Sequence, residues 1–225
     1  MNKQKILTIR FKNALRQEEL QHFRGAINHA MEKANILFHN HTDDNYRYSY
    51  PLIQYKRISR CATIVCINEG TGVIGEFFSN CNFDIVLGSK NIELDVDSVK
   101  ANQVIVQVWD DLFSYRINKW LPFNQTNYRQ YSEQEGISEK CTMLEKILIG
   151  NILSFAKGLG LFVDKPIICK ITDIDKLYVI RYKGVSMTSF DAEFKCNMSI
   201  LDFVGLGKGV SLGFGTVTRK RINKE

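Results

Sequence analysis

Hydrophobic and polar positions divide the first half of the chain into short strands and two helices. Residues 7–12 alternate between apolar and polar side chains and predict a half-buried strand. Apolar residues at helical spacing over 17–34 predict an amphipathic helix. The remaining elements are predicted as strands at 52–59 and 61–67, a short helix at 70–80, and a fourth strand at 83–87 or 92–96. This is the ferredoxin-like order of strand, helix, two strands, helix and strand, and RNA-recognition domains use the same kind of sheet.

The second half of the chain predicts the same order with its second helix reduced. Strands are predicted at 104–109, 112–117, 167–171, 176–181, 185–190 and 194–200, with a last strand from Thr216. The aromatic and amide-rich segment 120–131 is predicted as a loop, and the helix over 138–157 is apolar nearly all round and is expected to be buried. We therefore predict an α+β fold of two tandem ferredoxin-like (RRM-like) domains, at 1–98 and 99–225, with a C-terminal Gly-rich loop.

The Gly-rich loop lies just before the predicted last strand. Its glycines are Gly205, Gly207, Gly209, Gly213 and Gly215, and Lys208 lies among them. Glycine permits positive φ and close approach of a ligand, and successive N–H groups in such a turn form a concave anion site. A P-loop is excluded because Asp202 stands where its first glycine should be, and the G-x-G-x-x-G fingerprint fails on spacing. The two interpretations left are a phosphate cradle and a flexible turn.

The composition shows a mild excess of basic residues, and the cysteine pattern favours reduced thiols. The 225 residues carry a formal net charge of +6, which favours a polyanionic partner. The cysteines show no zinc or C-x-x-C spacing and are interpreted as reduced core thiols of a cytoplasmic protein. They are Cys61, Cys66, Cys81, Cys141, Cys169 and Cys196. The N-terminus predicts no cleavable signal, and no apolar run reaches the roughly 18 residues of a membrane span.

Two of the four histidines, His39 and His41, follow the first predicted helix in a polar segment. Histidine titrates near neutrality, so a pair can act as base and acid in one reaction. On RNA such a pair would activate the 2′-hydroxyl and protonate the leaving 5′-oxygen without a metal. Two alternatives stay open: ordinary loop residues, or a metal site with Asp43 and Asp44. Residues near enough in sequence to assist are Lys33, Tyr46, Arg47, Tyr48 and Lys56.

Several segments resemble the CRISPR-associated endoribonucleases that process repeat RNA, members of the RAMP superfamily. Gly205, Gly207, Gly213 and Gly215 match the family's loop G-x-G-x-x-x-x-x-G-x-G. The stretches 37–41, 50–56, 120–128 and 149–154 look like the subgroup with a histidine pair after the first helix. The resemblance covers nearly the whole chain.

This resemblance implies metal-independent cleavage inside the repeat of a precursor CRISPR transcript, with no cofactor. His39 and His41 become the general base and acid in an unassigned order, and Tyr48 and Lys56 become supporting groups. The implied partners are repeat RNA and other CRISPR effector subunits, with a monomer or homodimer and no membrane. The residues expected to bind RNA are the loop glycines and Lys208, together with Arg47, Arg57, Arg60, Arg219 and Lys220. The alternative interpretation of these basic residues is a solvated charged surface.

Two other functions remain as alternatives. A non-catalytic RAMP subunit that binds guide RNA in an effector complex would share the fold and the Gly-rich loop without needing the histidine pair. A plain RRM-like binder would place aromatic residues at the centre of its first sheet, which Thr8, Arg10 and Lys12 do not favour. Aromatic side chains of the segment 120–131 are candidates for stacking on unpaired bases.

Overall fold

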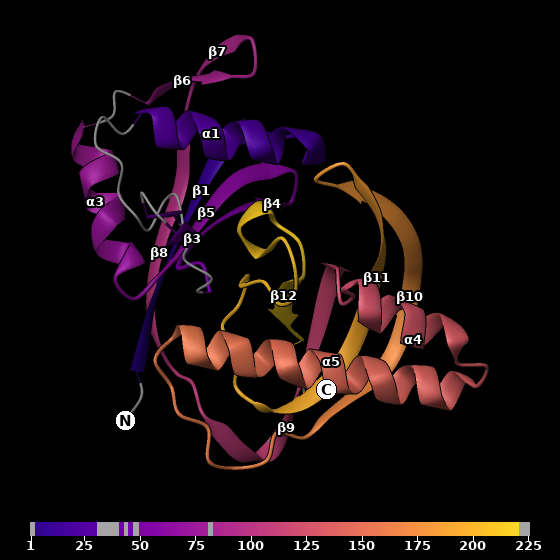
Figure 1. The fold of residues 1–225 in the computed structure, drawn as a ribbon. Helices are drawn as coiled ribbons and strands as arrows, with labels where there is room; N and C mark the ends of the chain where they lie inside the picture. Colours follow the sequence, from indigo (N-terminus) through magenta and orange to yellow (C-terminus); the bar gives the residue numbers. More distant parts are fainter. Residues whose placement is uncertain (1–2, 31–40, 43–44, 47–49, 81–82, 221–225) are drawn as a thin grey trace, which may run out of the picture. The chain divides into compact units, whose positions relative to one another are not determined.

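The computed structural model describes residues 3–30, 41–42, 45–46, 50–80 and 83–220. The chain forms two compact units (Figure 1). The first consists of Lys3–Ile105 together with Ser211–Gly213, and the second consists of Val106–Val210 and the segment from Phe214 onward. Each unit contains one four-stranded antiparallel sheet, which confirms the predicted α+β class.

The first sheet has the strand order β4-β5-β1-β8. Its unit comprises β1 (Lys3–Ala14), η1 (Gln17–Glu19), α1 (Leu20–Ala30), β4 (Ile53–Ile58), β5 (Cys61–Ile67), α3 (Gly70–Asn80) and β8 (Val96–Ile105). Two small ladders are also present, β2 (His41–Thr42) with β3 (Asn45–Tyr46), and β6 (Asp84–Leu87) with β7 (Lys90–Glu93). The first and third long strands lie in the middle, as the ferredoxin-like order requires.

The core of the first unit forms between α1 and one face of this sheet. Phe23 of α1 is fully buried and meets Phe11 and Tyr55 edge to face, with ring centroids 6.1 and 5.8 Å apart. Leu20 and Ile27 lie one helical turn on either side of Phe23 and are buried as well. The helical apolar spacing predicted from the sequence therefore faces the sheet.

The fourth strand of the first sheet differs from both predicted positions. The segments near 83–87 and 92–96 contribute to the β6–β7 ladder, which turns at Gly88 with a φ of +66°. Ile85 and Leu87 of β6 pack into the core of this unit. The alternation of apolar and polar residues therefore does mark a strand, but this strand belongs to a two-stranded ladder outside the main sheet. The fourth strand is β8, which the sequence hides because most of its side chains are exposed at an edge. The predicted boundary at 98/99 lies inside β8, and the compact units divide after Ile105.

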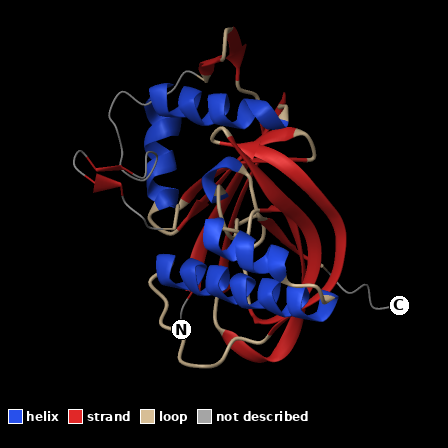
Figure 2. Cartoon of the chain, turned by 45° about the vertical axis from the view of Figure 1, so that its right-hand side comes forward, coloured by secondary structure: helices blue, strands red, loops and turns tan. Residues whose placement is uncertain are grey.

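The second sheet has the equivalent order β10-β11-β9-β12. Its unit comprises β9 (Val108–Trp120), α4 (Gln125–Glu133), α5 (Ile137–Gly158), β10 (Cys169–Tyr182), β11 (Val185–Met198) and β12 (Thr216–Arg219). Between β11 and β12 along the chain lies η2 (Val210–Leu212), of which Val210 belongs to this unit and the other two residues to the first. A single 3₁₀ turn, η2, stands where the second helix of a ferredoxin-like unit would be, which confirms the predicted reduction. Figure 2 shows α4 and α5 side by side along this sheet.

Strands β10 and β11 are each fourteen residues long, where shorter separate strands were predicted. They join through Lys183 and Gly184, with φ values of +49° and +82°, as a two-residue hairpin turn of type I′ requires. Asp173 and Asp175 interrupt the apolar alternation of β10, which explains the shorter prediction. The register shifts beside these residues show that the strand continues through bulges.

Two predictions for the helical layer of the second unit were wrong. Residues 125–133 form α4 and not a loop, because the Asn124 side chain accepts a hydrogen bond from the Asn127 N–H and caps the helix. Helix α5 buries one face only, with Leu144, Leu148, Ile152 and Phe155 inside. Its other apolar side chains are partly open, and Leu153 is 43% exposed. Within the described residues, no helix has the length and apolarity that crossing a membrane requires.

Candidate functional site

The predicted catalytic histidines lie at the limit of what the structure describes. His39, Arg47 and Tyr48 fall outside the described residues. The backbone of His41 begins β2 and pairs in register with Tyr46 of β3. The catalytic roles of His39, His41 and Tyr48 therefore stay predictions from sequence.

Lys56 is described in full and is completely buried in the first unit. It lies in β4 opposite Thr63 of β5, and it projects to the other face of the sheet from Tyr55, the next residue along the strand. Burial removes water from the ammonium and lowers its pKa to about 7. Near neutral pH this amine therefore exists in both protonation states.

Replacing Lys56 by methionine is expected to stabilise the protein most at low pH. Below about pH 7 the lysine is charged in both states, so folding carries the full cost of burying that charge. The cost disappears as pH rises toward 10.5, the ordinary pKa of lysine, because the unfolded chain then loses its proton too. In urea unfolding near pH 6, the free energy of unfolding of Lys56→Met should exceed that of the wild type by on the order of a few kcal/mol, as expected for a buried charge. This difference should shrink by pH 10. Lys208→Met, at an exposed lysine, is the control. An advantage that is constant across pH would contradict the role of the buried charge.

The glycines of the Gly-rich loop are required by close packing inside the protein. Gly207, Gly209, Gly213 and Gly215 all have positive φ, between +61° and +89°. A Cβ on Gly207 would lie 2.9 Å from the Trp120 indole nitrogen, and one on Gly215 would overlap the Leu206 carbonyl oxygen. The loop therefore needs glycine for its own fold, whether or not it also holds a phosphate.

Several backbone N–H groups of the loop already have acceptors. Those of Leu206, Lys208, Phe214 and Gly215 donate to carbonyl oxygens of the protein. The N–H groups of Gly207 and Gly209 donate to no other residue in the described part of the chain. They flank Lys208, whose side chain is exposed. The N–H groups beside Lys208 can therefore meet an anion together with its ammonium, whereas part of the predicted cradle already bonds to the protein itself.

The predicted RNA-binding cations differ in their surroundings. Arg57 donates from its Nε to the Leu15 carbonyl oxygen. Arg219 lies over the Phe113 ring, 4.4 Å from its centroid, and the Lys220 ammonium lies 2.7 Å from the Glu193 carboxylate. Arg60 is exposed in the tight turn between β4 and β5, where its φ is +67°. Among the described members of this set, Lys220 makes an ion pair, Arg57 binds a carbonyl oxygen and Arg219 packs on a ring, whereas the side chains of Arg60 and Lys208 are exposed.

The aromatic segment 120–131 serves mainly as core. Trp120 and Phe123 are buried and both pack near Phe190, with ring centroids 6.1 and 5.7 Å from it. Tyr128 is half exposed and is the aromatic of this segment best placed to stack on a base.

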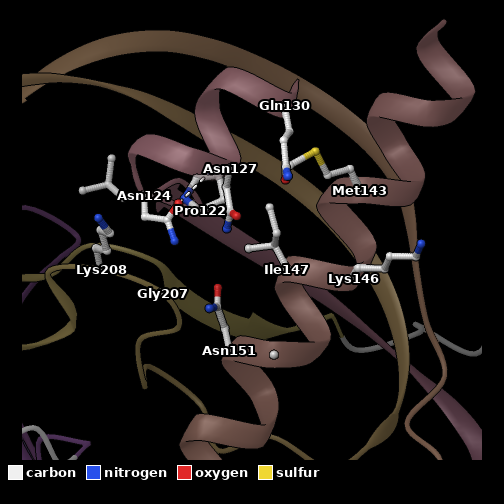
Figure 3. A pocket seen from close by; sticks show the side chains of 12 residues that line it. Pro122, Asn124, Asn127, Gln130, Met143, Lys146, Ile147, Asn151, Gly207 and Lys208 are labelled. Carbon is white, nitrogen blue, oxygen red and sulfur yellow. Dashed lines mark hydrogen bonds between the residues drawn. The ribbon is translucent and has the colours of Figure 1, made fainter. Parts of the chain in front are cut away.

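Sequence reasoning missed the amide side chains of this segment. Asn124, Asn127 and Gln130 recur every three residues along α4 and line a pocket with Asn151 of α5 (Figure 3). The signal was present, since polar amides at helical spacing after an N-cap residue form one face. It was hidden because the segment was interpreted as a loop.

Comparison with known proteins agrees with this architecture. The family model of the Cas6b N-terminal domain matches residues 2–105, and that of the Cas6b C-terminal domain matches residues 107–220. An uncharacterised protein of Methanocaldococcus jannaschii is 36% identical over 113 residues, which are 50% of this chain and 76% of that protein.

Solved structures resemble the whole chain. A crystal structure of Cas6b has a TM-score of 0.86 and 26% identity, over 97% of this chain and 100% of that chain. A structure described as the CRISPR RNA processing endoribonuclease Cas6b has a TM-score of 0.76 and 24% identity over the same shares, which supports the fold. Because the two family models follow one another along nearly the whole chain, in step with its two ferredoxin-like units, this protein belongs to the Cas6b family.

Proposed function

We propose that this protein is a metal-independent endoribonuclease that cleaves precursor CRISPR RNA within the repeat to generate guide RNAs. The observation that carries the proposal is the match of both Cas6b domain models to a chain with a histidine pair after its first helix. A similar structure of 24% identity is described as a CRISPR RNA processing endoribonuclease, which supports the same activity here.

The proposed reaction needs one base and one acid. One of His39 and His41 removes the proton of the 2′-hydroxyl, and the oxygen attacks the adjacent phosphorus. The bond from phosphorus to the 5′-oxygen breaks, and the other histidine protonates that oxygen. The products are a 2′,3′-cyclic phosphate and a 5′-hydroxyl, and no cofactor takes part. Tyr48 and Lys56 are proposed to stabilise charge on the phosphorane.

RNA phosphates are proposed to bind the loop around Lys208 and the exposed arginine of the β4–β5 turn. The N–H groups of Gly207 and Gly209 point to this role because no described residue accepts from them. The proposed set also contains Arg57, Arg219 and Lys220, which are weaker candidates because each already contacts another residue of the protein. Arg47 is retained as a proposal from sequence, since it lies outside the described residues. We further propose that the protein acts in the cytoplasm, as a monomer or homodimer, alone or beside other CRISPR effector subunits.

The nature of the product ends tests this function. Purified protein should cut its cognate repeat RNA, and the downstream fragment should accept a 5′ phosphate from polynucleotide kinase without prior dephosphorylation. The upstream fragment should carry a cyclic phosphate that acid opens. A downstream fragment that already carries a 5′ phosphate would contradict the proposed chemistry. Tight binding without any cutting would favour the second function, a guide-RNA-binding subunit of an effector complex.

A further inference from the structure

The second unit contains an open pocket of about 580 Å³ between α4, α5 and the residues Gly207 and Lys208 (Figure 3). This volume lies within the range of roughly 300–1,000 Å³ typical of small-ligand sites. Met143 and Ile147 give it an apolar wall, with the buried Leu121 behind them, and amide side chains give it a polar one. No Asp or Glu occurs among the described residues that line it, and lysines are its only charged lining residues.

One amide of the pocket is oriented by the cap of α4. The Asn124 Oδ1 accepts a hydrogen bond from the Asn127 N–H at 2.7 Å. A backbone N–H can only donate, so the oxygen of this amide must face the helix. The Asn124 NH₂ group is therefore left as a donor on the other side.

A second amide is oriented by a buried indole. The Trp120 Nε1–H donates to the Asn151 Oδ1 at 2.9 Å, and Trp120 is completely buried. Indole nitrogen is a donor only, so the Asn151 NH₂ group is also left as a donor. Figure 3 shows Asn124, Asn127 and Asn151 extending toward one another, while Lys146 points away from them.

Two fixed NH₂ donors beside an apolar wall match the base edge that carries position 4 of a pyrimidine or position 6 of a purine, where a carbonyl accepts and an amino group does not. Guanine presents O6 and N7 as acceptors and uracil presents O4, whereas cytosine and adenine present amino groups at the equivalent position. Single-stranded RNA exposes these edges, and its bases also pack against apolar side chains. A free phosphate would use the donors but not the wall formed by Met143 and Ile147.

We propose that this pocket binds one unpaired nucleotide of the RNA and selects uracil or guanine over cytosine or adenine. Asn124 and Asn151 donate to O4 of uracil or O6 of guanine, the apolar wall packs against the base, and Lys208 at the rim faces its phosphate. The inference rests on the proposed function only in taking RNA as the ligand.

Octauridylate and octacytidylate form a matched pair of probes, because they differ in the group at position 4 of the base. Binding of each is measured by fluorescence anisotropy with the purified full chain at about 0.1 M salt, since phosphate contacts depend on salt. The wild-type protein should bind octauridylate about tenfold more tightly, as expected for a well-made base contact.

Three variants remove the donors without removing the structural hydrogen bonds. In Asn124→Asp and Asn151→Asp a carboxylate oxygen still accepts from Asn127 or Trp120, and Asn124→Ser keeps the cap without adding charge. The preference for octauridylate should fall to within about twofold in each variant. Gln125→Glu makes the same change of charge on α4 outside this pocket and should keep the preference. Lys208→Ala should weaken both probes equally.

Equal binding of the two probes by the wild type would overturn the proposal, and so would a preference that survives in Asn124→Asp and Asn124→Ser. Cleavage of repeat RNA, measured in parallel, separates this inference from the proposed function. A protein that selects octauridylate but never cuts would keep the pocket and lose the nuclease. A protein that cuts but shows no preference would keep the nuclease and lose the pocket.

Discussion

Alanine at either His39 or His41 is expected to slow cleavage of repeat RNA by about a hundredfold or more. A general acid or base typically contributes this much, because without it the 2′-hydroxyl proton or the leaving oxygen must exchange protons with water. Binding should be nearly unchanged, since the phosphate contacts are proposed to come mainly from other residues. The measurement is the single-turnover rate at saturating protein, beside the dissociation constant for an RNA with a 2′-deoxy substitution at the cut.

The chain provides matched controls for this experiment. His22 and His29 lie exposed on α1, and His22→Ala and His29→Ala should cut at the wild-type rate. All four histidines are thereby tested by the same substitution. Wild-type rates in both His39→Ala and His41→Ala would rule out the histidine pair as the acid and base.

Alanine at Gly215 is expected to destabilise the second unit by about 3 kcal/mol or more. Gly215 has a φ of +61°, and a Cβ there would overlap the Leu206 carbonyl oxygen, so the backbone of the loop would have to move. Its N–H also donates to the Lys119 carbonyl oxygen at 3.0 Å, and that contact would be strained by the movement. Urea unfolding followed by tryptophan fluorescence would measure the loss, since Trp120 lies in this unit.

Gly184 is the matched control for that substitution. It has a φ of +82°, but a Cβ there would meet nothing within 4 Å, so Gly184→Ala isolates the cost of positive φ alone. That cost should be about 1–2 kcal/mol. If Gly215→Ala were no more destabilising than Gly184→Ala, the glycines of the loop would not be retained for packing, and an open phosphate cradle would explain them better.

Much of the fold could be predicted because strands with one buried face alternate clearly. The strand around Ile9 and Phe11 and the helix with Phe23 were predicted near their observed positions for this reason. Strand β8 was missed because an edge strand with exposed side chains has little alternation to detect. Helix α4 was missed because it has no buried apolar stripe of its own. Its Tyr128 and Tyr131 pack instead on Phe123, which precedes the helix.

The candidate site was predictable in kind and less so in detail. The alternation of apolar and polar residues in β4 predicts that Gln54 and Lys56 are exposed, yet both are buried. Such an alternation cannot show whether the polar face of a strand is also covered by other parts of the protein. The glycines of the loop suggested a ligand, whereas their immediate neighbours are side chains and carbonyls of the protein itself. The amides of Asn124 and Asn151 gained a role only once their hydrogen-bond partners were visible.

Attack by the RNA's own 2′-hydroxyl is tested by cleavage of the cognate repeat RNA in excess EDTA, beside a copy with one 2′-deoxy substitution at the scissile nucleotide. We expect full cutting of the unmodified RNA in EDTA and no cutting of the deoxy copy at that position, because the attacking group would be the RNA's own hydroxyl. Loss of cutting in EDTA, or cutting of the deoxy copy at the same bond, would contradict it.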